Sequence, residues 1–185
     1  TRWTEFVEKY RASCVPDQSS IRHKRQTFRN ERTVHPDSGI HTTKSGDKVR
    51  ELALKMNCPV VQTSGGTSYI KGLEDRTFPY GFSDCSIDAV VESDLCLALG
   101  TELGEPSHFG RWRHWVANEA NRKWIYCNQD PTAIGVNRSI DVPLVGDIRG
   151  VVPQLVRALK DSPRAPSPNL QKYIDQDARQ MVELY

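Results

Sequence analysis

The feature that most constrains the fold of this chain is the segment Asp94-Leu95-Cys96-Leu97-Ala98-Leu99-Gly100, which is apolar at every position between Asp94 and Gly100. A strand with one solvent-facing side alternates apolar and polar residues, whereas a parallel strand that is covered on both faces is apolar throughout. The run therefore predicts a buried strand of a parallel sheet, with helices above and below it.

Segments on both sides of this run alternate between helix and strand patterns. Apolar residues at helical spacing, such as Val49, Leu52 and Met56, predict helices, and Asp147 is placed to cap the helix that follows it. This order predicts an α/β fold, a doubly wound and mostly parallel sheet with helices on both faces. The expected helices cover residues 45–56, 86–92, 112–120 (apolar face Trp112, Trp115, Val116 and Ala120) and 148–159, and the other expected strands cover residues 59–63, 123–128 and 142–145.

The two ends of the chain predict a different organisation. Residues 1–37 carry scattered apolar residues and are expected to form an irregular segment or a linker, so the α/β domain is placed at 38–160. Residues 161–185 combine a Pro/Ser linker with a last helix, which either docks on this domain or belongs to a join with another one. Because the chain starts at Thr1 rather than at methionine, we expect a fragment of a longer protein. The apolar face of the last helix is expected to contain Leu170, Tyr173, Ile174, Ala178 and Met181.

Composition narrows the class of protein. The first fifty residues hold eleven Lys/Arg and six Asp/Glu, but Phe28 is the one aromatic among the basic residues 22–32, so a solvated segment is favoured over nucleic-acid binding. The sequence contains no run of eighteen apolar residues, so it predicts no membrane-spanning helix. Five cysteines without a CxxC pair or zinc spacing predict a reducing, cytoplasmic protein without a metal site, with Cys96 and Cys127 in the core.

Loops that follow the expected strands are the candidate ligand site, because ligands of doubly wound sheets bind at the carboxyl ends of the strands. Glycines there let backbone amides approach a phosphate, and an aspartate after a strand can accept a hydrogen bond from a ribose hydroxyl. The alternative is that these glycines only make tight turns, since neither GxGxxG nor GxxxxGK[ST] is present. The loops are Ser64-Gly65-Gly66-Thr67, Gly100-Thr101-Glu102, Asn128-Gln129-Asp130-Pro131 and Gly146-Asp147.

Side chains that carry catalysis are not evident. His108 and His114 lie six residues apart, which is not the spacing of a ligand pair on one helix face. The sequence indicates neither a Ser-His-Asp nor a Cys-His catalytic set. Glu102 and Glu105 could form an acid pair, but exposed surface carboxylates are the usual explanation for such residues. We therefore assign no catalytic and no metal-binding residue.

Four segments, taken in order, resemble the central domain of thiamin-diphosphate-dependent enzymes, the acetolactate synthase and 2-oxo-acid decarboxylase family. The resemblance covers roughly residues 38–160 and implies a Rossmann-like sheet of the DHS-like NAD/FAD-binding type. Residues 31–36 depart from the family because they form a poor strand by sequence. The matching segments are Glu51–Thr63, Glu92–Thr101, Lys123–Gly135 and Asp141–Asp147.

Membership of this family would imply that the chain is a spacer domain between two cofactor-binding domains. Its enzymes hold thiamin diphosphate and Mg²⁺ between their N- and C-terminal domains, which supply the activating glutamate and the Gly-Asp-Gly…Asn motif. Gly146-Asp147 is followed by Ile148 and is not that motif. The resemblance thus implies a non-catalytic central domain, inactive alone, whose partners are those two domains in a cytoplasmic homo-oligomer.

The alternative is an autonomous module that binds FAD, ADP or NAD, because the central domain of some family members binds FAD or ADP. Those that bind FAD carry an arginine soon after the Gly-Thr/Ala pair, whereas Glu102 and Glu105 stand here, so Arg111 or Arg113 would have to compensate. The matching cofactor-binding positions are Ser64, Gly65, Gly66, Gly100, Thr101, Asp130, Ala133, Ile134, Gly146 and Asp147.

Overall fold

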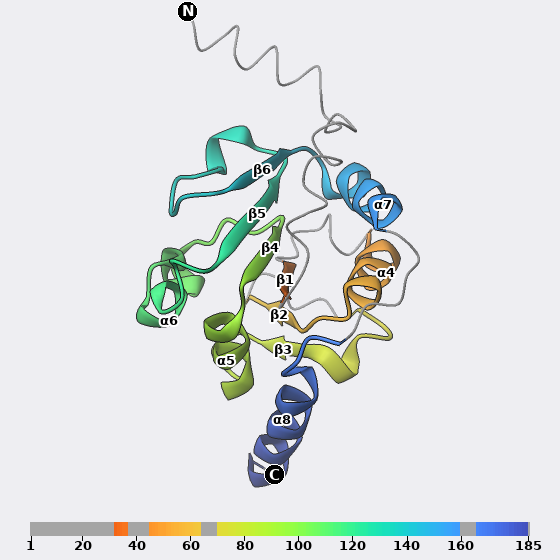
Figure 1. Cartoon of the computed structure of the whole chain (residues 1–185), viewed down its shortest axis with the longest axis vertical. Helices are drawn as coiled ribbons and strands as arrows, with labels where there is room; N and C mark the ends of the chain where they lie inside the picture. Colours follow the sequence, from red (N-terminus) through yellow and green to blue (C-terminus); the bar gives the residue numbers. More distant parts are fainter. Residues whose placement is uncertain (1–31, 37–44, 64–69, 160–165, 185) are drawn as a thin grey trace, which may run out of the picture.

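The computed structural model describes the backbone of residues 32–36 and the residues 45–63, 70–159 and 166–184 (Figure 1). Most of the expected elements occur at the expected positions. The elements are β1 (Arg32–Pro36), α4 (Gly46–Met56), β2 (Val60–Gln62), η3 (Glu74–Arg76), β3 (Thr77–Pro79), α5 (Asp84–Glu92), β4 (Leu95–Leu99), η4 (Glu105–Gly110), α6 (Arg113–Val116), β5 (Lys123–Asn128), η5 (Pro131–Ala133), β6 (Val142–Val145), α7 (Ile148–Ala158) and α8 (Leu170–Leu184).

The strands form one parallel sheet in the order β3-β2-β1-β4-β5-β6. This is the strand order of dinucleotide-binding folds, in which the direction of winding reverses beside the first strand. Here the reversal lies between β1 and β4. The expected doubly wound α/β fold is confirmed.

Strand β4 explains why its sequence is apolar at every position. All five of its residues are buried. Leu95, Leu97 and Leu99 join the hydrophobic cluster under α4 and α7, whereas Cys96 and Ala98 join the cluster under α5 and α6 on the other face. In Figure 1, α4 and α7 lie on one side of the sheet and α5 and α6 on the other. The strand contributes to both halves of the core, and each buried leucine stabilises it by roughly 1.5–3 kcal/mol.

Strand β1 corrects the expected start of the domain. Residues 32–36 were assigned to an irregular segment or linker, yet they pair with β2 on one side and with β4 on the other, Val34 lying opposite Val60 and Leu97. A strand between two partners gains backbone hydrogen bonds on both edges, and these outweigh its weak local pattern. The sheet therefore begins at least six residues before residue 38.

Helix α6 corrects a second expectation. It spans four residues instead of the expected 112–120, and of its expected apolar face only Trp115 is buried. Trp112 and Val116 are each 50% exposed, and Ala120 is exposed. By contrast, Asp147 caps α7 as expected, and α4 ends at Met56 as expected, followed by Asn57 in the left-handed conformation (φ 50°).

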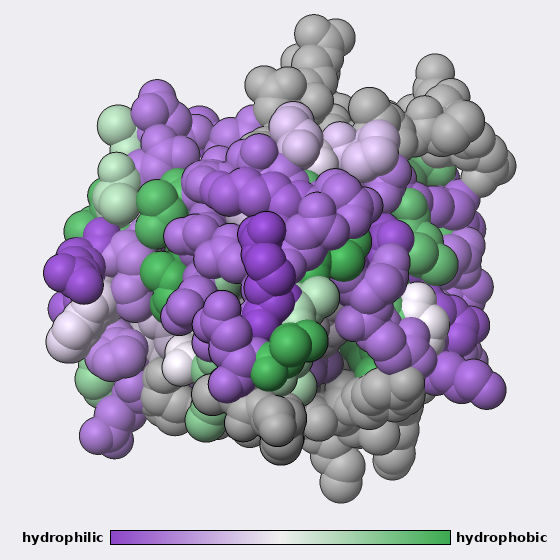
Figure 2. Space-filling view, turned by 90° about the horizontal axis from the view of Figure 1, so that it is seen from below, coloured by the Kyte–Doolittle hydropathy of each residue, from purple (hydrophilic) through white to green (hydrophobic). Residues whose placement is uncertain are grey.

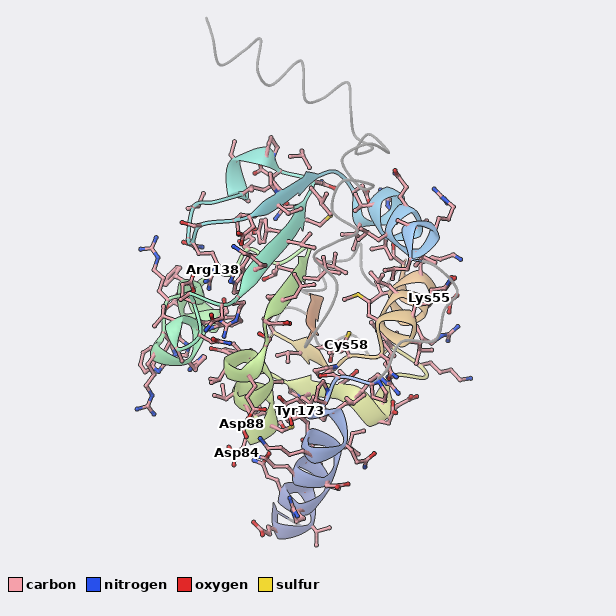
Figure 3. All side chains as sticks on the ribbon, viewed as in Figure 1. Lys55, Cys58, Asp84, Asp88, Arg138 and Tyr173 are labelled. Carbon is pink, nitrogen blue, oxygen red and sulfur yellow. The ribbon has the colours of Figure 1, made fainter. Side chains whose placement is uncertain are left out.

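Helix α8 docks on this domain, which settles the question left open for the last helix. It packs along α5 and beside β3, and Tyr173 points into this junction (Figure 3). The Tyr173 ring meets Phe78 edge-on at 6.4 Å between centroids. Leu170 and Tyr173 are buried, whereas Met181 is 48% exposed, so the expected apolar face is buried only in its first turns. Seen from the α8 end, the surface is mostly hydrophilic, with hydrophobic residues in separate small areas (Figure 2).

Two further features concern the described residues. Cys96 and Cys127 are buried core residues, as expected, and Cys58 and Cys85 are buried as well. Among the helices that the structure describes, none combines the length and apolarity needed to cross a bilayer.

Candidate functional site

The candidate site is the carboxyl edge of the sheet, where the parallel strands bring the loops after β4, β5 and β6 together. The amide of Gly100 donates to the carbonyl of Cys127 at 2.8 Å, and the amide of Gly146 donates to the carbonyl of Asn128 at 2.9 Å. Gly100 has φ +69°, a conformation that favours glycine. Ser64, Gly65 and Gly66, in the loop after β2, lie outside the described residues.

The polar groups of Thr101 are hydrogen-bonded to other residues of the domain. It is fully buried, and its carbonyl oxygen accepts hydrogen bonds from the hydroxyl of Tyr126 and from Asn128 Nδ2 (3.3 Å). Its own Oγ1 accepts from the amide of Leu103 at 3.0 Å. Asn128 belongs to a predicted ligand loop, whereas no role was predicted for Tyr126; the signal for their contact with Thr101 was a polar group on each residue in the second half of the strand Lys123–Asn128.

Asp130, Ala133 and Ile134 form the loop after β5. The Asp130 carboxylate caps η5 by accepting from Thr132 N (2.8 Å) and Thr132 Oγ1 (2.7 Å), and these bonds lower the pKa of Asp130. The Ala133 amide donates to the Asp130 carbonyl at 3.2 Å, and Ile134 packs against the core beneath α5 and α6. The loop is thus folded on itself, and Ile134 serves packing.

The carboxylate of Asp147, which follows β6, is also hydrogen-bonded within the protein. Its carboxylate accepts from the Arg149 amide at 2.8 Å, which caps α7, and it forms a forked ion pair with the Arg149 guanidinium. An aspartate that binds a ribose hydroxyl must offer a lone pair to it. Here Arg149 takes up much of the hydrogen-bond accepting capacity of the Asp147 carboxylate.

The charges near the edge decide whether an anionic cofactor fits. Glu102 and Glu105 are exposed in the loop after β4, as the sequence suggested. Arg111 is exposed too, but its guanidinium donates to the carbonyls of Asn137 (2.7 Å) and Val136 (3.2 Å). Arg113 is exposed on α6. Two carboxylates beside the Gly100-Thr101 turn fit a diphosphate poorly, because like charges repel.

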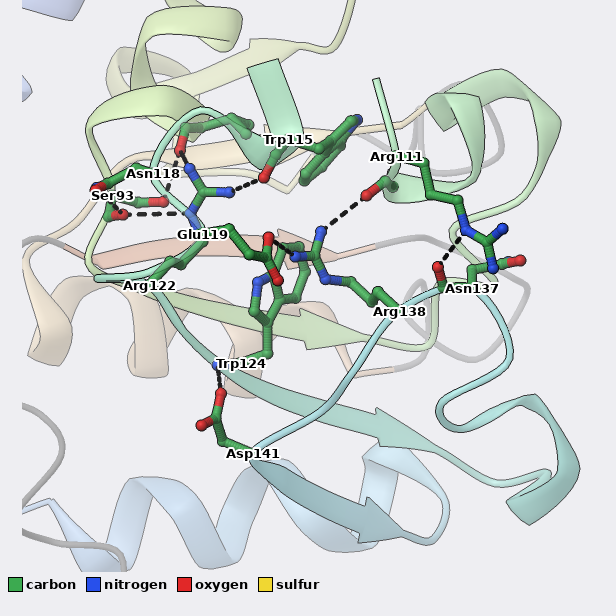
Figure 4. A network of polar contacts seen from close by, with 12 residues as sticks. Ser93, Arg111, Trp115, Asn118, Glu119, Arg122, Trp124, Asn137, Arg138 and Asp141 are labelled. Carbon is green, nitrogen blue, oxygen red and sulfur yellow. Dashed lines mark hydrogen bonds and ion pairs between the residues drawn. The ribbon is translucent and has the colours of Figure 1, made fainter. Parts of the chain in front are cut away.

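Figure 4 shows a polar network that contains two further arginines, Arg122 and Arg138. Arg122 is 3% exposed and donates to the carbonyls of Val90, Ser93 and Trp115. Arg138 stacks 3.7 Å above the Trp124 ring, pairs with Glu119 and donates to the Gly110 carbonyl at 2.9 Å. Both guanidinium groups tie loops to the sheet, so neither replaces the missing cofactor arginine.

A second polar cluster lies beside this edge, and the sequence missed it. The Tyr80 hydroxyl, just after β3, is in hydrogen-bond contact with His114 Nε2, lies 3.5 Å from His108 Nδ1 and accepts from Trp115 Nε1 at 2.8 Å. The two histidine rings, six residues apart in the sequence, are 6.3 Å apart between centroids. Because His108 comes from η4 and His114 from α6, a turn in the chain brings together residues that one continuous helix would separate.

The backbone of this second cluster is strained. His108 (φ 52°) and Phe109 (φ 54°) both adopt the left-handed conformation, as does Leu103 (φ 47°). Such residues cost of the order of 1–3 kcal/mol each and persist only where the surroundings hold them. Among the residues that the structure describes, no group of three or more His, Cys, Asp or Glu is arranged to hold a metal ion.

Comparison with known proteins supplies the family. A family model described as the central domain of thiamine pyrophosphate enzymes matches residues 31–155. The chain belongs to this family. The match includes β1, in agreement with the corrected start of the sheet.

Relatives of this central domain are acetolactate synthases. The acetolactate synthase of Mycobacterium avium is 30% identical over 157 residues, which are 82% of this chain and 24% of that protein. The acetolactate synthase large subunit IlvB1 of Mycobacterium tuberculosis is 29% identical over 82% of this chain and 25% of its own length. The large subunit of Buchnera aphidicola subsp. Schizaphis graminum is 24% identical over 69% of this chain. The chain spans about a quarter of the length of the mycobacterial relatives.

Proposed function

We propose that this chain is the non-catalytic central domain of a thiamin-diphosphate-dependent enzyme that acts on 2-oxo acids. In the whole enzyme it would hold the two domains that bind thiamin diphosphate and Mg²⁺ at the correct spacing, within a cytoplasmic homo-oligomer. The family match and the acetolactate synthase relatives support the parent class.

One observation carries the spacer role. At the carboxyl edge, the groups that would contact a nucleotide are already paired inside the protein: the Thr101 carbonyl with Tyr126, the Asp130 carboxylate with Thr132 and the Asp147 carboxylate with Arg149. A ligand would have to replace these contacts, which cost no association entropy because both partners belong to one chain. The edge is therefore better suited to rigidity than to binding.

A catalytic assay tests the proposal directly. The purified chain is incubated with pyruvate, thiamin diphosphate and Mg²⁺, and release of CO₂ is followed. We expect no release above the rate without protein, because no residue of the described edge is placed to deprotonate the thiazolium carbon. Turnover that scales with protein concentration would overturn the non-catalytic assignment.

The alternative function is binding of FAD or ADP at the same edge, which the strand order and the Gly100 turn favour. Denaturation of the purified chain, followed by an absorbance spectrum and chromatography of the supernatant, separates the two. A flavin or adenine nucleotide in stoichiometric amount supports the alternative. A colourless protein that releases nothing supports the spacer.

A further inference from the structure

The cluster around the Tyr80 hydroxyl joins two parts of the chain that the sheet alone does not connect. Tyr80 follows β3 and is anchored there, because its amide donates to the Gln62 carbonyl at 2.7 Å and its side chain is 5% exposed. His108, His114 and Trp115 belong to the segment Glu105–Val116, formed by η4 and α6. Three side chains of that segment thus converge on one oxygen atom.

The number of protons in the cluster determines its bonding. The Tyr80 oxygen carries one hydrogen and accepts the Trp115 N–H, so that hydrogen needs an acceptor nitrogen on His114 or His108. Burial raises the pKa of Tyr80 to about 12, so the phenol keeps its hydrogen across the physiological range. A neutral imidazole at either His108 or His114 can accept the phenol hydrogen, whereas two imidazolium rings offer no acceptor nitrogen.

Charge around the cluster opposes protonation of the histidines. Burial first, and then the neighbouring His108, Arg113 and Arg122, lower the pKa of His114. No carboxylate is among the groups that act on His114 in the described structure. Proton uptake would place two imidazolium rings beside each other and beside these arginines, without an acceptor for the phenol hydrogen.

The strained backbone at His108 and Phe109 favours release of the segment Glu105–Val116. His108 and Phe109 are held in the left-handed conformation, and Trp112 packs on the His108 ring at 4.4 Å between centroids while remaining 50% exposed. Phe109 is 47% exposed, so little apolar burial holds this turn in place. The contacts at Tyr80 therefore constrain the strained turn from the β3 side, in addition to the hydrogen bond from Arg138 to the Gly110 carbonyl and that from the Phe109 amide to the Gly104 carbonyl.

We propose that Tyr80, His108 and His114 form a proton-sensitive latch, which holds the segment Glu105–Val116 against the turn after β3 when the histidines are neutral and releases it when both are protonated. Release would free the segment that carries Arg111 and borders the Leu103 turn. The carboxyl edge would then loosen in acid while the sheet stays folded.

Hydrogen exchange measured by mass spectrometry tests the latch on the intact chain. Exchange is compared between about pH 7.5 and about pH 5, the range in which histidine titrates, after correction for the intrinsic pH dependence. We expect amides of residues 105–116 to exchange ~10-fold faster in acid, because local opening of the segment becomes more favourable. Peptides from β4 and β5 should remain protected.

Matched variants make the test specific. His114→Gln and His108→Gln each keep a neutral acceptor for the Tyr80 hydrogen, so both should abolish the acid-induced exchange while leaving protection at neutral pH intact. His23→Gln, which changes a histidine outside the described residues, should behave as the unmodified chain. The latch is refuted if the unmodified chain shows no transition, if both glutamine variants retain it, or if β4 and β5 lose protection together with residues 105–116.

Discussion

At the scale of single residues, the carboxylates of Asp130 and Asp147 act on the backbone. Asp130 and Asp147 each follow a strand, and each accepts from the amide two positions later. In both cases the side chain satisfies an amide that the first turn of a helix leaves without an intrahelical partner. The aspartates after β5 and β6 are therefore explained by capping.

Replacement of Asp147 by alanine tests this role. We expect Asp147→Ala to lower the free energy of unfolding by about 0.5–2 kcal/mol, as for loss of other N-caps. Arg149→Gln is the matched control, because it removes only the exposed half of the ion pair and should cost less than loss of the cap. Urea denaturation measures both, and equal losses would show that the ion pair, not the cap, stabilises α7.

At the scale of elements, α8 is fastened to both ends of α5. The Glu92 carboxylate at the end of α5 accepts from Asn169 (2.7 Å), Lys172 (2.6 Å) and Tyr173 (2.7 Å). At the start of α5, Ser83 Oγ donates to Asp177 Oδ1 at 2.5 Å. The helix is held by polar contacts in addition to the buried Tyr173 ring.

Acid should loosen this fastening. Burial alone would raise the pKa of Glu92, but the hydrogen bonds from Lys172 and Tyr173 outweigh it and leave the pKa below its usual 4.5. A depressed carboxyl pKa contributes stability that is present above 4.5 and is lost as pH falls through the folded-state value. We expect the α8 amides to lose exchange protection in this window. Glu92→Gln should show weaker protection already at neutral pH and no such loss in acid; an unchanged acid response in the variant would contradict the assignment.

The central strand sets the stability of the whole sheet. Leu97→Ala leaves a cavity under α4 and α7 and should lower the free energy of unfolding by about 2–5 kcal/mol. Leu54→Ala, at a position of α4 that is 45% exposed, should cost within about 0.5 kcal/mol. Thermal and urea unfolding check the pair, and a small effect at Leu97 would mean that β4 is not the centre of the core.

At the scale of the whole molecule, the domain has the strand order of nucleotide-binding proteins, and at its carboxyl edge the Thr101 carbonyl and the carboxylates of Asp130 and Asp147 are paired internally. A ligand that binds the native state raises the free energy of unfolding by about 2.7 kcal/mol at one hundred times its Kd. The spacer assignment therefore predicts that millimolar ADP and FAD leave Tm unchanged. A rise in Tm that saturates with either compound would instead establish a nucleotide site.

The sequence by itself determined the elements whose residues carry their own pattern. The apolar run of β4, the helical spacing of α4 and α7 and the cap at Asp147 are local features, and burial on one or both faces leaves a direct mark on composition. The order of these segments also determined the family, because similarity to a domain accumulates over many positions.

The tertiary structure decided everything that depends on partners distant in the chain. Strand β1 forms because β2 and β4 pair with it on both sides, and helix α6 stops after one turn around the buried Trp115. His108 and His114 meet at Tyr80 because η4 and α6 fold back towards β3. Hydrogen bonds and packing between such segments depend on three-dimensional distance, which no periodicity along the chain records.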